Sequence, residues 1–121
     1  MRKAIVLFII LISACPALAN WRMYSEDKKI VASFDYLSRA SCQDRPCIWV
    51  RWHYVNPDKG IGGVKIRFAA DCATHRLYEI QSDPYDTEGN YLGLIRREDA
   101  PKEYPVTPGS LNEATYNLMC R

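Results

Sequence analysis

The stretch DCATH (residues 71–75) places a cysteine and a histidine three residues apart. Cys72 and His75 could hold a metal, could form a reactive thiol with its base, or could leave the cysteine free for a disulfide. A zinc site needs about four ligands, and the only other histidine is His53, with no second C-x-x-H or C-x-x-C motif. We therefore expect no metal, no cofactor and no catalytic pair, and we predict that the protein is not an enzyme.

Residues 1–19 have the features of a bacterial secretory signal peptide. Arg2 and Lys3 precede an apolar run, which ends in small residues with an A-x-A cleavage pattern before Asn20. The run is shorter than the roughly 20 residues of a membrane-spanning helix. We expect residues 20–121 to form the exported domain, with no transmembrane segment, located in the periplasm, on the cell surface or outside the cell.

A second processing route involves Cys15. The residues ISAC (12–15) resemble a lipobox, in which Cys15 would be lipidated and would anchor the protein to the outer membrane. Signal peptidase I is favoured because Pro16 would directly follow the lipidated cysteine and because Trp21 leaves little room for a flexible linker. Both routes remain open, and both remove Cys15 from disulfide chemistry.

The charge of the exported domain gives no argument for nucleic acid as a partner. The chain has 16 Lys and Arg against 14 Asp and Glu, but Arg2 and Lys3 belong to the signal peptide, so the remainder is formally neutral. A neutral domain lacks the basic surplus that neutralises phosphates. About one hundred residues form one small domain with a modest core, to which disulfides would add stability.

The dominant period of the exported domain is two, which is typical of half-buried β-strands. One predicted sheet face carries Ile48, Val50, Trp52 and Tyr54 together with Val64, Ile66, Phe68, Ala70 and Cys72. The other face carries Trp49, Arg51, His53 and Val55 together with Lys65, Arg67, Ala69 and Asp71. Residues 56–63 (NPDKGIGG) predict the turn of an antiparallel hairpin between the two strands.

The remaining segments predict an α+β domain. We expect a strand within residues 29–37, a hairpin of residues 75–82 and 90–95 around the turn 83–89, and an irregular Pro-rich connection over 98–109. Ser110 and Glu113 form a capping box that begins a C-terminal helix, with Leu111, Ala114 and Leu118 as its apolar stripe. The predicted fold is an antiparallel sheet of about five to six strands packed on one C-terminal helix.

The four remaining cysteines are an even set, as expected in an oxidising compartment. The helix should cover the face that carries Trp52, Phe68 and Cys72, so Cys72 is predicted to pair with Cys120 at the helix end. Cys42 and Cys47 would then close a small loop. On the loop-entropy model, the long bridge contributes about 4 kcal/mol and the short one about 2 kcal/mol. Four cysteines allow three pairings, and the sequence alone leaves the choice open.

The order of several short motifs resembles the surface-adhesin protein E family. These motifs are the aromatic start Trp21, the pair Asp35-Tyr36, the W-x-R/H strand, Asp71-Cys72, the YDTEG turn (85–89), the P-G-S before the helix, and Cys120. The resemblance covers nearly all of residues 21–121. It implies a secreted or outer-membrane-associated domain with a sheet packed on a C-terminal helix, and a role in binding host matrix or plasma proteins. The CQDRPC loop (42–47) is an addition to the family pattern.

Two classes of function follow from these expectations. In the first, the domain is an adhesin-like binding module whose open sheet face, or the turn around Tyr85 and Tyr91, contacts a protein; the candidate face comprises Trp49, Arg51, His53, Lys65 and Arg67. In the second, it is a periplasmic inhibitor or envelope-maintenance factor that binds one specific enzyme through the loop 42–47. A homodimer is a further option.

Overall fold

The computed structural model describes residues 20–121, apart from the side chain of Asp58, so the predicted signal peptide and Cys15 lie outside the described residues. The described part of the chain contains eight strands: β1 (Trp21–Glu26), β2 (Ile30–Asp35), β3 (Ala40–Cys42), β4 (Arg45–Asp58), β5 (Ile61–Asp71), β6 (Arg76–Asp86), β7 (Ile95–Arg96) and β8 (Lys102–Tyr104). A short 3-10 helix, η3 (Tyr36–Ser38), follows β2, and the α-helix α1 (Leu111–Cys120) follows β8. Within residues 20–121, neither helix has the length and apolar character needed to cross a bilayer.

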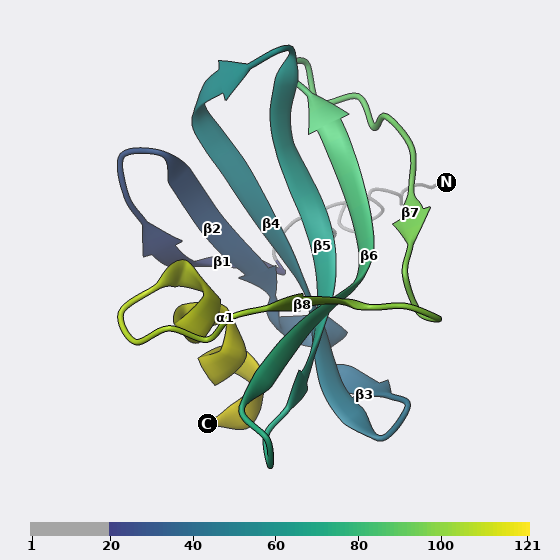
Figure 1. Ribbon diagram of the computed structural model, residues 1–121. Helices are drawn as coiled ribbons and strands as arrows, with labels where there is room; N and C mark the ends of the chain where they lie inside the picture. Colours follow the sequence, from purple (N-terminus) through teal and green to yellow (C-terminus); the bar gives the residue numbers. More distant parts are fainter. Residues whose placement is uncertain (1–19) are drawn as a thin grey trace, which may run out of the picture.

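All strands belong to one antiparallel sheet (Figure 1). Its main order is β1-β2-β4-β5-β6-β7; β3 pairs with the beginning of β4, and β8 pairs with the beginning of β6. The sheet packs on the C-terminal helix and carries two disulfides, so the predicted fold class is confirmed. The strands that were not predicted are β1, which pairs along the length of β2, and the three-residue strands β3 and β8, which pair with the beginnings of β4 and β6.

The hairpin of β4 and β5 has a tighter turn than expected. Residues 56–63 were predicted as the turn, but strand pairing continues to Asp58↔Ile61 and leaves only Lys59 and Gly60 between the strands. Both have positive φ, 57° and 78°. A two-residue turn with two positive φ values matches the right-handed twist of the flanking strands.

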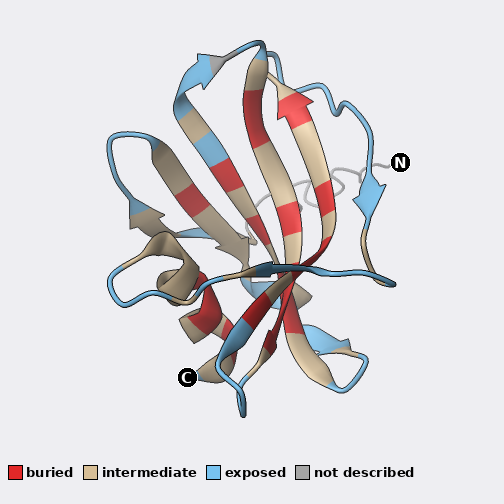
Figure 2. Ribbon diagram, in the orientation of Figure 1, coloured by how far each residue is buried: buried red, intermediate tan, exposed pale blue. Residues whose placement is uncertain are grey.

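The predicted core face is confirmed. Ile48, Val50, Phe68 and Ala70 are fully buried, and Trp52 is 8% exposed. The helix contributes Tyr116 and Met119 to the same cluster, and Figure 2 shows the buried positions running along the central strands and the helix side that faces them. Alternation along the strand puts these side chains on one side of the sheet, where burial of their apolar area stabilises the fold.

The helix presents a different stripe from the one predicted. Thr115, Tyr116 and Met119 are its buried residues, while Leu111 and Leu118 pack at the margin of the core and Ala114 lies outside it. Thr115 faces inward because its hydroxyl is satisfied there: it donates to the Leu111 carbonyl (2.9 Å) and accepts from the Tyr24 hydroxyl (2.8 Å). Tyr24 in turn accepts from Nε1 of Trp52 at 2.9 Å, which completes a buried chain of hydrogen bonds.

The connection over residues 98–109 is not wholly irregular as predicted, since it contains β8. Tyr104 of β8 packs edge-on against Phe68 (5.4 Å between ring centroids) and Trp52 (6.3 Å), and so covers the part of the core face beside the helix. Its hydroxyl donates to Oε1 of the buried Glu79 (2.6 Å), and Arg97 donates to Oε2 (2.8 Å). Burial and the bond to Glu79 raise the pKa of Tyr104. The paired carboxylate thereby fixes β8 against β6.

The predicted hairpin around residues 83–89 is present with different bounds. β6 continues through Pro84 to Asp86, and the returning strand β7 is only two residues long. An isolated bridge joins Tyr85 to Tyr91. The short returning strand leaves Leu92, Leu94 and Ile95 exposed at this edge of the sheet.

Candidate functional site on the open face of the sheet

The stretch DCATH forms a structural turn between β5 and β6. Cys72 is bonded to Cys120, the predicted pairing, with Cα atoms 5.6 Å apart, so its sulfur is not free for metal or nucleophilic chemistry. Cys72 is exposed in the turn and does not continue the inward alternation that was predicted. The Tyr116 hydroxyl donates to the Cys72 carbonyl (3.2 Å), and the His75 ring lies 4.6 Å from the Tyr116 ring, so both halves of the stretch hold the helix.

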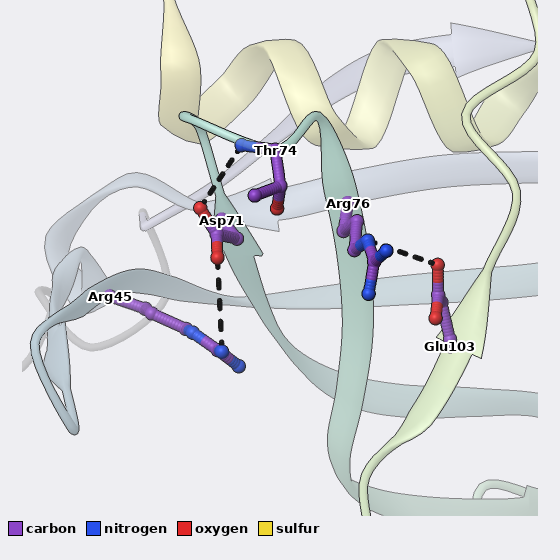
Figure 3. A network of polar contacts seen from close by, with 5 residues as sticks. All are labelled: Arg45, Asp71, Thr74, Arg76 and Glu103. Carbon is purple, nitrogen blue, oxygen red and sulfur yellow. Dashed lines mark hydrogen bonds and ion pairs between the residues drawn. The ribbon is translucent and has the colours of Figure 1, made fainter.

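Polar contacts support the same turn (Figure 3). Asp71 accepts from the Thr74 amide (3.2 Å), which lowers the pKa of its carboxyl, and it pairs with Arg45 at 3.8 Å. Arg76 and Glu103 connect β6 to β8 at 3.9 Å. These are exposed pairs of small energetic value. Among residues 20–121, no group of three or more His, Cys, Asp and Glu side chains is arranged to hold a metal ion.

The five residues of the predicted binding face lie together on the sheet face opposite the core. Trp49 is in register with Arg67, Arg51 with Lys65, and His53 with Gly63. Side chains directly across an antiparallel pair lie about 5 Å apart at Cβ. The structure therefore forms one continuous aromatic and basic surface from residues of β4 and β5, which we call the open face.

Aromatic rings hold the cations of the open face. The Lys65 ammonium lies 4.8 Å and the Arg67 guanidinium 5.9 Å from the centre of the Trp49 ring. The Arg51 guanidinium lies 4.4 Å from the Trp21 ring, which comes from β1. Sequence reasoning noted Trp21 only as an aromatic start, and no local signal could place it beside Arg51. Each cation–π contact of this exposed kind contributes about 0.5–1 kcal/mol.

None of these cations belongs to an ion pair of the described chain. Among residues 20–121, the ion pairs of arginine involve Arg45, Arg76, Arg96 and Arg97, while Arg51, Lys65 and Arg67 form none. Nε of Arg67 is also buried without a hydrogen-bond partner. Asp83 of β6 is in register with Lys65 but does not reach ion-pair distance. The cations are therefore held on aromatic rings and not in ion pairs, although Asp83 lies near Lys65 and Glu98 near Arg67.

At one end of the open face, the side chains of three strands surround a cavity. His53, Gly63 and Tyr85 follow one another across β4, β5 and β6, and Nδ1 of His53 lies 3.2 Å from the Tyr85 hydroxyl. The cavity has a volume of about 390 Å³; it is lined by Val31, Ser33, Arg51, His53, Tyr85, Gly89 and Tyr91. Burial raises the pKa of Tyr85, and the Arg51 charge partly opposes this shift.

The tyrosines of this cavity were predicted separately from the basic face. Tyr85 and Tyr91 were assigned to a turn, as an alternative contact surface to Arg51 and His53. The structure joins the two candidates, because Tyr85 lies over Gly63 and reaches His53. A glycine that interrupts the side-chain alternation of β5 was the one sequence signal for a close approach at this position.

The other end of the face is partly covered, which corrects the expectation of a wholly open surface. Cys47 and Ala69 are buried there with Ile80 and pack against Cys42. The loop 42–47 is part of a hairpin of β3 and β4, in which Cys42 pairs with Arg45 in register and is disulfide-bonded to Cys47. A second cavity of about 290 Å³ lies between this hairpin and the segment after β7; Arg45, Arg67 and Glu98 contribute to its lining.

The chain matches no protein-family model, no curated protein and no solved structure. The resemblance to the surface-adhesin protein E family therefore stays a prediction from the order of its motifs.

Proposed function

We propose that this protein is an exported bacterial binding module whose open face contacts a partner protein. The proposal rests on one observation about the basic side chains of this face. Arg51, Lys65 and Arg67 lie over tryptophan rings and have no ion-pair partner among the described residues. Tryptophan and arginine are the residues that dominate the energetics of protein interfaces. A surface prepared in this way can bind carboxylates while losing little side-chain entropy.

Two features support export and an extracellular or envelope-associated partner. The four cysteines of the described chain form two disulfides, which persist in oxidising compartments. The motif order resembles an adhesin family that binds host matrix and plasma proteins. We therefore propose a host matrix or plasma protein as the partner, recognised through acidic side chains that meet the open face.

The proposal is tested by capture of purified host matrix and plasma proteins on the disulfide-bonded protein. We expect Trp49→Ala and Arg51→Ala each to weaken capture. The matched control is Arg22→Ala, because Arg22 also stacks on an aromatic ring, that of Tyr36 at 4.2 Å, but follows Trp21 in β1 and so points to the opposite side of the strand. Equal loss of capture in all three variants, or in none, would contradict a contact at the open face.

A second candidate function is inhibition of one periplasmic enzyme. The observation that favours it is the β3–β4 hairpin, whose turn residues Gln43 and Asp44 are exposed with φ values of 53° and 68° and are tied down by the Cys42–Cys47 disulfide. A rigid projecting turn loses little entropy when it enters a cleft. Capture from periplasmic extract that depends on Cys42 and Cys47 but not on Arg51 would favour this function over the first.

A further inference from the structure

We propose that the cavity between His53, Tyr85 and Tyr91 binds a saccharide that carries a carboxylate, of the sialic acid or uronic acid class. This inference goes beyond the proposed function, because it names a small-molecule ligand for one end of the open face and does not depend on contact of a protein with Trp49. It rests on three features of the cavity: a preformed wall, a lining of hydroxyls and aromatic rings, and a single guanidinium without a counter-charge.

The wall of the cavity is built by a loop that hydrogen bonds hold in one conformation. Oδ1 of Asp86 accepts from the amides of Glu88 and Asn90, each at 2.9 Å, and the Asp86 amide donates to the Asn90 carbonyl at 2.9 Å. The bridge between Tyr85 and Tyr91 closes the base of the loop. Ligand binding at a preformed wall of this kind does not have to order the loop first.

The lining suits a ring that has an apolar face and a hydroxylated edge. Tyr91 is 54% exposed and meets the ring of Tyr85, which is 7% exposed, edge-on at 5.9 Å and 78°, so the Tyr91 ring is the aromatic surface turned to solvent. Aromatic side chains offer such a surface to apolar C–H groups. The hydroxyls of Ser33 and Tyr91 can each donate or accept a hydrogen bond, and the Tyr85 hydroxyl and the His53 imidazole, which contact each other, each retain further hydrogen-bonding capacity. A saccharide ring can pack its apolar face on the aromatic ring and form hydrogen bonds with these polar groups at the same time.

Arg51 selects a saccharide with a carboxylate over a neutral one. Its guanidinium is stacked on Trp21, which leaves the N–H groups at the edge of the plane available to a ligand. Arginine binds carboxylates with two parallel hydrogen bonds. Among the described residues, no Asp or Glu lines the cavity, so the charge of Arg51 is not cancelled by a lining side chain. An acidic side chain of a protein would use the guanidinium but would leave the tyrosine surface and the hydroxyls without partners.

The test is a titration of the disulfide-bonded protein followed by amide chemical shifts. The probes are N-acetylneuraminic acid, glucuronic acid, galactose, acetate and a short peptide rich in Asp and Glu; the two acidic sugars distinguish the two sources of the carboxylate. We expect at least one acidic sugar to shift the amides of Ser33, Arg51 and Tyr91 in a saturable way. Galactose and acetate should each bind about tenfold more weakly, because each lacks one half of the contacts.

Variants locate the binding and keep the test independent of the proposed function. Arg51→Lys keeps the positive charge but loses the two parallel N–H donors of the guanidinium, and Tyr91→Ala loses the aromatic ring. Each should weaken binding of the acidic sugar about tenfold. Arg22→Ala and Trp49→Ala should leave this binding unchanged. Thermal melting checks that each variant is folded. No saturable shift with either acidic sugar, or equal binding of acetate or the peptide, would overturn this inference. If protein capture still depends on Trp49 in that case, the proposed function survives; if the sugar binds but capture ignores Trp49, only the proposed function fails.

Discussion

Tyr85 crosses β5 above Gly63 and places its hydroxyl 3.2 Å from Nδ1 of His53. The two rings are nearly parallel, with centroids 6.2 Å apart and an angle of 18°. This contact joins β4 to β6 over the strand between them, and it forms the floor of the cavity at the end of the open face. It depends on the absence of a side chain at position 63.

Gly63→Ala should therefore destabilise the fold and break the His53–Tyr85 contact. A Cβ at position 63 would overlap the Tyr85 hydroxyl and the Trp52 carbonyl oxygen, and overpacking of this kind typically lowers the free energy of unfolding by about 1–3 kcal/mol. The Cβ would also overlap Cζ of Tyr85, so Tyr85→Phe removes one of three overlapping atoms, and denaturant melts of the double variant should show less than the sum of the two single effects. Strict additivity would mean that Tyr85 does not lie over Gly63.

The two central tryptophans should respond differently to truncation. Trp52 is 8% exposed in the core, so Trp52→Ala should lower the free energy of unfolding by about 3–5 kcal/mol. Trp49 is half-buried on the open face, where its ring contacts Lys65 and Arg67, so Trp49→Ala should lower it by about 1 kcal/mol. Thermal melts of both variants make the comparison. A larger loss for Trp49→Ala would reverse the assignment of the two faces.

The buried chain of hydrogen bonds that includes Thr115 of the helix predicts that Thr115→Val lowers the free energy of unfolding. Valine has nearly the same shape as threonine but leaves the Tyr24 hydroxyl without its acceptor, and an unsatisfied buried group lowers the free energy of unfolding by about 1–3 kcal/mol. Thr115→Ser keeps the hydroxyl and serves as the matched control, with a smaller loss from the missing methyl group. Urea denaturation measures both. If serine is no better than valine, the hydroxyl contributes nothing and packing alone explains the position.

Removal of the two disulfides should have unequal effects. The Cys72–Cys120 bond joins residues separated by 48 positions and the Cys42–Cys47 bond residues separated by 5. On the loop-entropy model, replacing both cysteines by alanine should lower the free energy of unfolding by about 4 kcal/mol for the Cys72–Cys120 bond and by about 2 kcal/mol for the Cys42–Cys47 bond. Melts under non-reducing conditions compare them, and mass mapping of the wild-type protein checks the pairing. A crossed pairing would also contradict the contact between the β5–β6 turn and the end of α1.

Four tyrosines predict loss of stability at alkaline pH. Burial raises the pKa of Tyr24, Tyr54, Tyr85 and Tyr104 above the ordinary value of 10.0. Because the unfolded chain releases these protons at lower pH than the folded chain, their contribution is complete below pH 10.0 and is lost as the pH rises through the folded-state values. Phenolate absorbance should therefore develop at higher pH in the folded protein than in urea. Coincident titration curves would show that these hydroxyls are accessible to water.

Local sequence patterns were sufficient to assign the core-facing side chains of β4 and β5 and the residue at which the helix begins. Alternation along an extended backbone is a local property, so Ile48, Trp52 and Phe68 could be assigned to one face without knowledge of their neighbours. The capping box is equally local: the Ser110 hydroxyl accepts from the Glu113 amide at 3.1 Å, and Glu113 accepts from the Gly109 amide at 2.9 Å. The pairing Cys72–Cys120 was favoured by the sequence but not determined by it, because three pairings were open and Cys72 does not continue the inward alternation.

Contacts between residues distant in sequence decide which helix residues are buried and which short segments become strands. Thr115 faces inward because Tyr24, 91 residues earlier in the sequence, satisfies its hydroxyl. β8 forms between prolines because β6 offers it unpaired backbone groups and Glu79 accepts from Tyr104. The partner in each case is distant in sequence, so no local pattern carries the information.

The position of Tyr85 in the cavity on the open face also could not be predicted from a local sequence pattern. Arg67 is in register with Gln81 and Phe68 with Glu79, so Ile80 is an extra residue in β6. A bulge of this kind reverses the alternation beyond it, and without it Tyr85 would point to the same side as Leu77 and Glu79, toward the core. The sequence of β6 looks the same with either register. Pairing with β5 determines the register and brings Tyr85 over Gly63, in the alignment that also places Ser82 beside Ile66.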